Sequence, residues 1–517
     1  MRPALLALAL ALAAPPAWAV AAPPATDRAA AIADPDSRAW WQITEHLSSD
    51  AMEGRDIGSA GHERAGRWVA EQFRVAGLKP AGDNGTFFQT FPVHEARVQA
   101  ADLRIEDDRG RWIRPRFLQH YSVRAADDLP EQIQGKMLFG GYCRSEDLIA
   151  AAGKVVFCFN TRRAGLTNAA ERGRNVQAAG GVALVQVDDP GFTIEPARWP
   201  AAYARTVTLA DAPSPRTGGF AVLSISAQMF ERIAAGAGRD GKSVLAAGAA
   251  KQPLAPFDMP GRLTATFKVT TRDFKATNVL AVLPGSDPAL AAEHLVLSAH
   301  LDGYGFGEPV GGDRLYNGAL DDAAYVATLI RFAQTHAGRP PKRSVLLAAF
   351  TGEEKGLLGA TWFTRHPTVP KSALVADINL DQLRPLFPLK LMTVHALDES
   401  SLGATVREVA GSMGIRTQPD LEPERGLVSR ADNWPFMQIG VPATGFVFGY
   451  EPGTEAERRY REWYQVRYHR PQDDISQPMD FEAAGAFNRF FYKLAETVAD
   501  APQRPTWTPG SRYAPKP

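Results

Sequence analysis

Five dispersed residues have the side chains that a pair of metal ions would need: His300, Asp321, Glu354, Asp381 and His469. Imidazole nitrogens and carboxylate oxygens are common protein ligands of zinc and similar cations. Two such ions about 3.5–4 Å apart need one carboxylate that bridges them and a water held between them. The chemistry that this set predicts is therefore hydrolysis by a metal-activated water.

Neighbouring residues supply the other groups that such a site requires. Glu353 stands beside a predicted ligand, and a carboxylate that is free of the metal can act as the general base on the water. Asp302, two residues after His300, is placed to accept the ring N–H that faces away from the metal. Asp321 is the bridging candidate, because it precedes a helical pattern at 323–332 whose amino end favours an anion.

Most of these polar groups come directly after apolar runs that have the length and composition of buried strands. The runs are 294–299, 344–350 and 374–380, and they lead to His300, the Glu353–Glu354 pair and Asp381. The carboxyl ends of parallel strands form one edge of a sheet, where residues distant in sequence converge. The alternation of strands and helices predicts an α/β fold, with a mostly parallel mixed sheet flanked by helices.

Five motifs, in this order along the chain, resemble those of the M28 peptidases, a family of dizinc aminopeptidases and carboxypeptidases. They are His300-Leu-Asp302, Asn317-Gly-Ala-Leu-Asp321-Asp322, Gly352-Glu-Glu354, Leu380-Asp381 and Tyr468-His469-Arg-Pro-Gln-Asp-Asp474. The resemblance implies a zinc exopeptidase fold of the phosphorylase/hydrolase-like type and two Zn2+ ions per chain. The ligand types do not separate zinc from cobalt or manganese.

The resemblance also implies a role for each site residue. One zinc is bound by His300 and Asp381, the other by Glu354 and His469, and both by the bridging Asp321. Glu353 is then the base, and Tyr468 resembles the residue that polarises the scissile carbonyl.

A further segment, 430–436, resembles the part of the family that lines the substrate pocket. Within it, Asp432 is the candidate for a supporting contact or a contact with the substrate amine. The commonest version of the segment has a histidine where this chain has Asn433, so no metal role is transferred to that position.

The chain divides into five predicted parts. They are a signal peptide (1–19), a disordered leader (20–39), an M28 catalytic domain (40–114 and 257–500), an inserted domain (115–256) and a loose tail (501–517). The smaller, β-rich insert resembles the protease-associated (PA) domain that some family members carry. Its expected role is to cover or shape the cleft, although the sequence does not separate this from a plain structural insert.

Composition sets the expected surroundings of the protein. Lysine plus arginine equals aspartate plus glutamate, so nothing points to nucleic acid. After the signal sequence, no stretch reaches the ~20 apolar residues of a membrane span, and we expect an exported protein of the periplasm or extracellular space. Cys143 and Cys158 form either one disulfide or two buried thiols. The oligomeric state stays open.

We therefore expect an exported zinc-dependent exopeptidase that acts on peptides, and an aminopeptidase in particular. A carboxypeptidase of the same fold stays open, since Arg384 or Arg430 could hold a free carboxylate. A glutaminyl cyclase-like transferase would typically use a single zinc, and a non-catalytic receptor-like homologue would have lost ligands. The complete set of five ligands argues against both.

Overall fold

The computed structural model describes residues 28–190 and 200–515 of the 517-residue chain. The predicted signal peptide lies outside these residues, as does the first part of the predicted leader. Within the described part, a helix already begins at Pro35, inside the segment that the sequence predicts to be disordered. It forms there because Asp34 caps it, accepting the N–H of Ser37 at 2.9 Å, and because Trp40 and Trp41 are buried.

A central group of strands carries the predicted site. It is ordered β18 (Ala443–Thr444), β15 (Leu374–Asn379), β11 (His294–His300), β14 (Ser344–Phe350) and β10 (Phe257–Leu283). The first four strands are parallel to one another, and β10 is antiparallel to β14. Strands β11, β14 and β15 are almost wholly buried, as apolar parallel strands with both faces covered must be.

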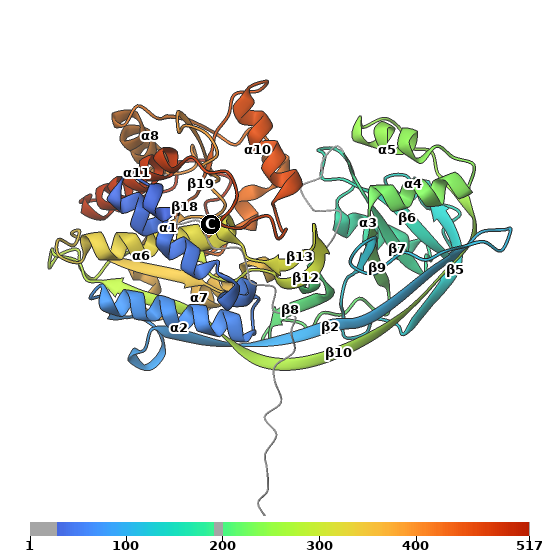
Figure 1. The fold of residues 1–517 in the computed structure, drawn as a ribbon, viewed down its shortest axis with the longest axis horizontal. Coiled ribbons are helices and arrows are strands. Elements are labelled where there is room, and N and C mark those ends of the chain that lie inside the picture. Colours follow the sequence, from blue (N-terminus) through green and yellow to red (C-terminus); the bar gives the residue numbers. More distant parts are fainter. Residues whose placement is uncertain (1–27, 191–199, 516–517) are drawn as a thin grey trace, which may run out of the picture.

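Helices cover both faces of this sheet, which confirms the predicted fold class (Figure 1). One face packs on α1 (Pro35–Leu47), α2 (Ala60–Val75), α6 (Ala324–His336), α8 (Leu402–Ser412) and α11 (Phe481–Asp500). The other face packs on α7 (Leu358–Arg365) and α9 (Asn433–Gln438). Alternate residues of one strand serve the two faces: Leu295 and Leu297 face the first group, and Val296 faces the second.

A second half of the molecule has its own hydrophobic core. Its strands are β5 (Gln132–Phe139), β6 (Lys154–Asn160), β7 (Ala183–Asp188), β9 (Ala221–Ile225) and β4 (Tyr121–Val123), with helices α3 (Ala169–Ala178), α4 (Ala227–Gly236) and α5 (Gly241–Ala249). Cys143 and Cys158 form a disulfide in this half, which answers the question that the sequence leaves open. Whether this half is a PA domain stays a prediction.

Two long strands join the halves. β2 (Phe88–Glu106) and β10 pair along most of their length and run beneath both halves (Figure 1). The sequence predicts two strands, at 263–270 and 277–283, where the structure has the single strand β10. The stretch between them, 271–276, is held extended by its pairing with β2.

Smaller elements complete the described chain. They are β1 (Lys79–Pro80), β3 (Trp112–Ile113), β8 (Arg205–Leu209), the pair β12 (Gly305–Val310) and β13 (Asp313–Tyr316), the sheet of β16 (Leu391–Val394), β17 (Arg416–Gln418) and β19 (Phe446–Phe448), and α10 (Glu455–Val466). The tail is packed rather than loose, because Trp507 donates to the carbonyl of Gly440 and pairs with Ser400. None of the described helices is long and apolar enough to cross a membrane.

Candidate metal centre

The predicted ligands converge at one edge of the central sheet. His300 ends β11, Glu353 and Glu354 follow β14, and Asp381 follows β15. Asp321 lies in the turn before α6, and His469 lies in the loop between α10 and α11. Three groups of candidate ligand atoms, each lying within 4.8 Å of one another, form here: His300, Asp322 and Asp381; His300, Glu353 and Glu354; and Asp321, Glu354 and His469.

Asp321 lies between the two histidines and presents one oxygen to each. Its Oδ1 is 3.2 Å from Nε2 of His300, and its Oδ2 is 3.5 Å from Nε2 of His469. The His300 nitrogen is also 3.8 Å from Oδ1 of Asp381, and the His469 nitrogen is 3.6 Å from Oε2 of Glu354. This arrangement matches two ligand sets that share a single carboxylate.

Several of these atoms are buried without a hydrogen-bond partner in the described part of the chain. They are Nε2 of His300, both oxygens of Asp321, Oε1 of Glu354 and Oδ1 of Asp381. A buried polar atom that is left unpaired costs about 1–3 kcal/mol. Five such atoms aimed at one small region therefore fit a pair of divalent cations.

The negative charge of the cluster also favours the binding of cations. Burial, together with neighbouring carboxylates, holds the pKa of Glu353 well above its usual range. Burial and the adjacent Asp321 raise the pKa of Glu354 to about 8. Crowded, desolvated carboxylates repel one another, and bound cations would replace that repulsion with attraction.

Asp302 supports the site in a different way from the one that the sequence predicts. Nδ1 of His300 faces the backbone carbonyl of Asp302 at 3.2 Å, whereas the carboxylate is 3.8 Å away. That carboxylate accepts the backbone N–H groups of Glu353 and Glu354 at 3.1 and 3.3 Å. The expected contact of the carboxylate with the ring is thus corrected: Asp302 fixes the turn that presents Glu353 and Glu354.

Two further aspartates hold the ligand segments, and sequence reasoning gave neither of them this role. The carboxylate of Asp322 accepts the backbone N–H of His300 at 3.1 Å. The carboxylate of Asp473 accepts the N–H groups of Leu320 and Asp321, both at 3.0 Å. Asp473 follows His469 closely in the sequence, but its carboxylate holds the Asp321 turn.

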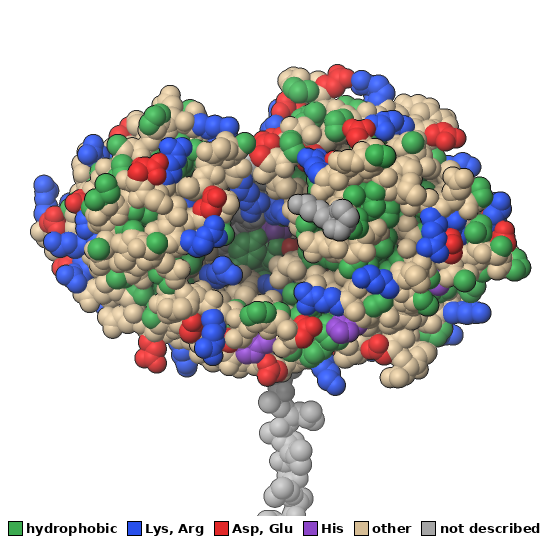
Figure 2. Space-filling view, turned by 180° about the vertical axis from the view of Figure 1, so that it is seen from behind, with side chains coloured by type: hydrophobic (Ala, Val, Ile, Leu, Met, Phe, Trp, Pro, Cys, Tyr) green, Lys and Arg blue, Asp and Glu red, His purple; other side chains and the backbone are tan. Residues whose placement is uncertain are grey.

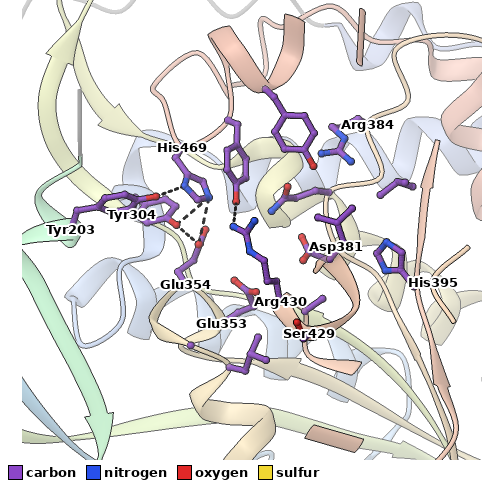
Figure 3. Close-up of a pocket in the computed structure, with 18 residues that line it drawn as sticks. Tyr203, Tyr304, Glu353, Glu354, Asp381, Arg384, His395, Ser429, Arg430 and His469 are labelled. Atoms are coloured by element: carbon purple, nitrogen blue, oxygen red, sulfur yellow. Dashed lines mark hydrogen bonds and ion pairs between the residues drawn. The ribbon is translucent and has the colours of Figure 1, made fainter. Parts of the chain in front are cut away.

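The ring of His469 meets two tyrosines that carry no sequence motif (Figure 3). The hydroxyl of Tyr203 is 2.5 Å from Nδ1, and the hydroxyl of Tyr304 is 3.0 Å from Nε2. Tyr304 also donates to the carboxylate of Glu354. Tyr203 belongs to the second half of the molecule, where Ala202 also accepts a hydrogen bond from Lys355 at 2.6 Å. The second half therefore reaches the metal-ligand cluster directly.

A cavity of about 400 Å³ lies beside the cluster, and Glu353, Asp381 and Tyr468 line it. The Tyr468 ring stacks on the His469 ring, with 3.5 Å between the ring centroids. Its hydroxyl accepts a hydrogen bond from Arg430 at 3.4 Å. The surface is hollowed between the two halves (Figure 2).

Asp432 is buried behind the cavity wall rather than on it. Its side chain is 1% exposed, while Ser429, Arg430 and Ala431 line the cavity. Burial raises the pKa of Asp432 to about 8, and neither carboxylate oxygen has a hydrogen-bond partner among the described residues. Because Asp432 does not line the cavity, its position is that of a supporting residue and not of a direct contact with a substrate amine.

Comparisons with known proteins agree with this geometry. Residues 278–495 match the model of Peptidase family M28. This stretch is less than half of the chain. All five predicted metal ligands, together with Glu353 and Tyr468, lie within the matched residues.

Curated relatives match part of this chain. A probable zinc metalloprotease of Pyrenophora teres f. teres (strain 0-1) is 28% identical over 242 residues, or 44% of this chain and 50% of that protein. A probable zinc metalloprotease of Pyrenophora tritici-repentis (strain Pt-1C-BFP) is 26% identical over 261 residues, or 44% of this chain and 58% of that protein. The chain thus spans about half the length of these relatives.

Solved structures share the fold over both halves. An aminopeptidase from Aneurinibacillus sp. strain AM-1 superposes with a TM-score of 0.58 and 16% identity, covering 90% of this chain and 95% of that one. A zinc aminopeptidase from Bacillus subtilis gives a TM-score of 0.56 and 17% identity, covering 89% and 94%. At these identities the likeness establishes the fold, which has a similar two-part architecture.

Proposed function

We propose that this protein is a zinc-dependent aminopeptidase that removes residues from the amino end of peptides. The observation that carries the proposal is the position of Asp321, which offers one carboxylate oxygen to each of two histidines among unpaired ligand atoms. The M28 match and the names of the relatives support a zinc peptidase. The fold shared with two aminopeptidases supports the choice of the amino end.

The site residues have distinct tasks in this proposal. His300, Asp381, Asp321, Glu354 and His469 would hold two zinc ions, which supply the positive charge that activates water and polarises a carbonyl. Glu353 lines the cavity and accepts the proton of the attacking water, and it then returns that proton to the leaving amine.

Tyr468 is placed to stabilise the developing oxyanion. Its oxygen accepts the N–H of Arg430, and a phenol hydroxyl can also donate a hydrogen bond to the carbonyl oxygen of the scissile bond. Stacking on His469 fixes the tyrosine ring next to a predicted ligand. Asp302, by holding the backbone of Glu353, keeps the base in position.

We also propose that the protein acts outside the cytoplasm, in the periplasm or the extracellular space. The signal-like sequence at 1–19 and the disulfide between Cys143 and Cys158 support this, since disulfides persist in oxidising compartments. Residues 115–256 would be a PA domain that completes one wall of the site through Tyr203.

A carboxypeptidase is the second candidate, because the cavity also carries Arg384 and Arg430, which could hold a terminal carboxylate. Aminoacyl-anilides with free or acetylated amino groups separate the two activities. An aminopeptidase cleaves only the free forms, is inhibited by a chelator, and loses activity in Glu353→Gln but not in the surface control Glu71→Gln. Release of C-terminal residues from blocked peptides, without anilide cleavage, would instead identify a carboxypeptidase.

A further inference from the structure

The cavity beside the metal-ligand cluster is lined by cations as well as by carboxylates. Its lining includes Glu353, Glu354 and Asp381, and also Arg384 and Arg430. In the view of Figure 3, Arg384 lies on the side of Asp381 that faces away from Glu354. Arg384 follows Asp381 by only three residues. One short loop therefore carries both a predicted metal ligand and a cation of the cavity wall.

Arg384 is buried, yet its guanidinium lacks an anionic partner. The residue is 1% exposed, and its Nε and Nη1 have no hydrogen-bond partner within the described residues. Its remaining nitrogen reaches the Tyr460 hydroxyl at 3.4 Å. Among the described carboxylates, none forms an ion pair with it. Burying a charge without a counter-charge costs free energy. An anionic group of a ligand would therefore stabilise Arg384.

Aromatic rings hold the guanidinium in a fixed place. Its central carbon is 4.6, 5.3 and 4.3 Å from the ring centroids of Tyr460, Trp463 and Tyr464, all on α10. Stacking on rings stabilises an arginine without occupying its N–H donors. The side chain is thus pre-oriented, and donors remain for a ligand.

Arg425 provides the comparison within the same cluster. Its central carbon lies 4.7 Å from the Tyr464 ring centroid, so it too is stacked and buried. However, it pairs with Glu422 at 3.0 Å. Among the described residues that line the cavity, Arg384 is present and Arg425 is not. Aromatic stacking alone therefore does not explain why Arg384 is left without a carboxylate.

We propose that Arg384 binds a carboxylate of the peptide substrate, so that the enzyme prefers substrates that place an anion in this cavity. Hydrogen bonds from a guanidinium to a carboxylate are charge-assisted, and each of the two unpaired atoms can supply one. This proposal rests on the proposed peptidase function. The carboxylate comes either from an acidic side chain next to the scissile bond or from the C-terminus of a short peptide.

Two pairs of substrates distinguish these sources. Glutamyl- and glutaminyl-anilide differ only in a side-chain carboxylate, and a dipeptide and its C-terminal amide differ only in the terminal one. Hydrogen bonds to charged groups are strong enough to give a preference of about 10- to 100-fold in kcat/KM. We expect that preference in one of the two pairs for the zinc-loaded, full-length protein.

Variants then test whether Arg384 causes the preference for the substrate with the carboxylate. Arg384→Gln should bring the ratio within the preferred pair close to one, mainly through KM, and Arg384→Lys should restore part of it. The matched control Arg425→Gln also removes a stacked guanidinium, but it should leave the ratio unchanged.

Equal kcat/KM values within both substrate pairs for the wild-type protein would overturn the proposal for Arg384 without any variant. Hydrolysis of the neutral substrates in the same assay would show that the protein is still a peptidase. A ratio that survives Arg384→Gln would likewise overturn it. If the zinc-loaded wild-type protein hydrolyses no peptide or anilide, the proposed function fails, and the proposal fails with it.

Discussion

Tyr203→Phe tests whether the second half of the molecule helps to hold a metal. Nδ1 of His469 is 2.5 Å from the Tyr203 hydroxyl, and Nε2 faces Asp321 and Glu354. With Nε2 directed to a metal, Nδ1 carries the ring proton and donates it to the tyrosine oxygen. The substitution removes this one oxygen and keeps the ring.

The loss of such a supporting hydrogen bond typically weakens metal affinity about 10- to 100-fold. This corresponds to about 1.4–2.7 kcal/mol. Tyr203 contacts His469, whereas His300 and Asp381 are the ligands predicted for the other zinc, so only one of the two zinc affinities should fall. Calorimetric titration of chelator-treated protein with zinc measures both affinities separately.

Tyr142→Phe is the matched control, since Tyr142 also lies in the second half and donates to the carbonyl of Gln252 at 2.8 Å. It should leave both zinc affinities unchanged. If Tyr203→Phe binds two zinc ions as tightly as the wild type, Tyr203 has no role in positioning His469, and the reasoning is refuted.

Three further predictions follow from the structure. Glu353→Gln should lower kcat by about 10²- to 10⁴-fold while zinc content stays at the wild-type level; a parallel loss of zinc would mean that Glu353 is a ligand instead of the base. Burial, and then Arg55, lowers the pKa of His62 to about 4, against about 6.5 in an unfolded chain. The unfolded state therefore takes up a proton first as the pH falls, and stability should drop by about 3 kcal/mol between pH 6.5 and 4. His62→Gln should flatten this dependence in denaturant unfolding, and an unchanged slope would contradict the assignment. Reduction of the disulfide, which closes a loop of sequence separation 15, should cost about 3 kcal/mol of stability; an unfolding midpoint that is insensitive to reductant would argue against this.

The central sheet was predictable because its strands are short, apolar and buried on both faces. The runs 294–299, 344–350 and 374–380 match β11, β14 and β15 closely, and each leads to a site residue. The convergence of these strand ends at one edge follows from parallel pairing. The helix after Asp321 has equally regular apolar spacing, and it forms as expected.

The interactions around the metal ligands were harder to predict. Tyr203 lies far from His469 in sequence, and a tyrosine in a turn carries no pattern that marks it as a partner of a ring nitrogen. Asp302 and Asp473 were recognised as acidic residues near ligands, but which donor each carboxylate meets depends on turn geometry. Asp432 was chosen because its segment resembles a pocket lining of the family, and that resemblance does not show that the residue is buried at the start of α9.

Zinc stoichiometry tests the central claim most directly, because that claim is a shared carboxylate between two metal sites. The chelator-treated protein is titrated with zinc, as wild type, Asp381→Ala and Asp321→Ala, and peptide hydrolysis is followed in parallel. Asp321 touches both histidines, whereas Asp381 lies near His300 alone. We predict that the wild type binds two zinc ions per chain. One of the two sites should be weakened in Asp381→Ala, and both sites should be weakened in Asp321→Ala. A wild-type protein that binds fewer than two ions, or that hydrolyses peptides without zinc, would contradict the claim of two metal sites that share a carboxylate.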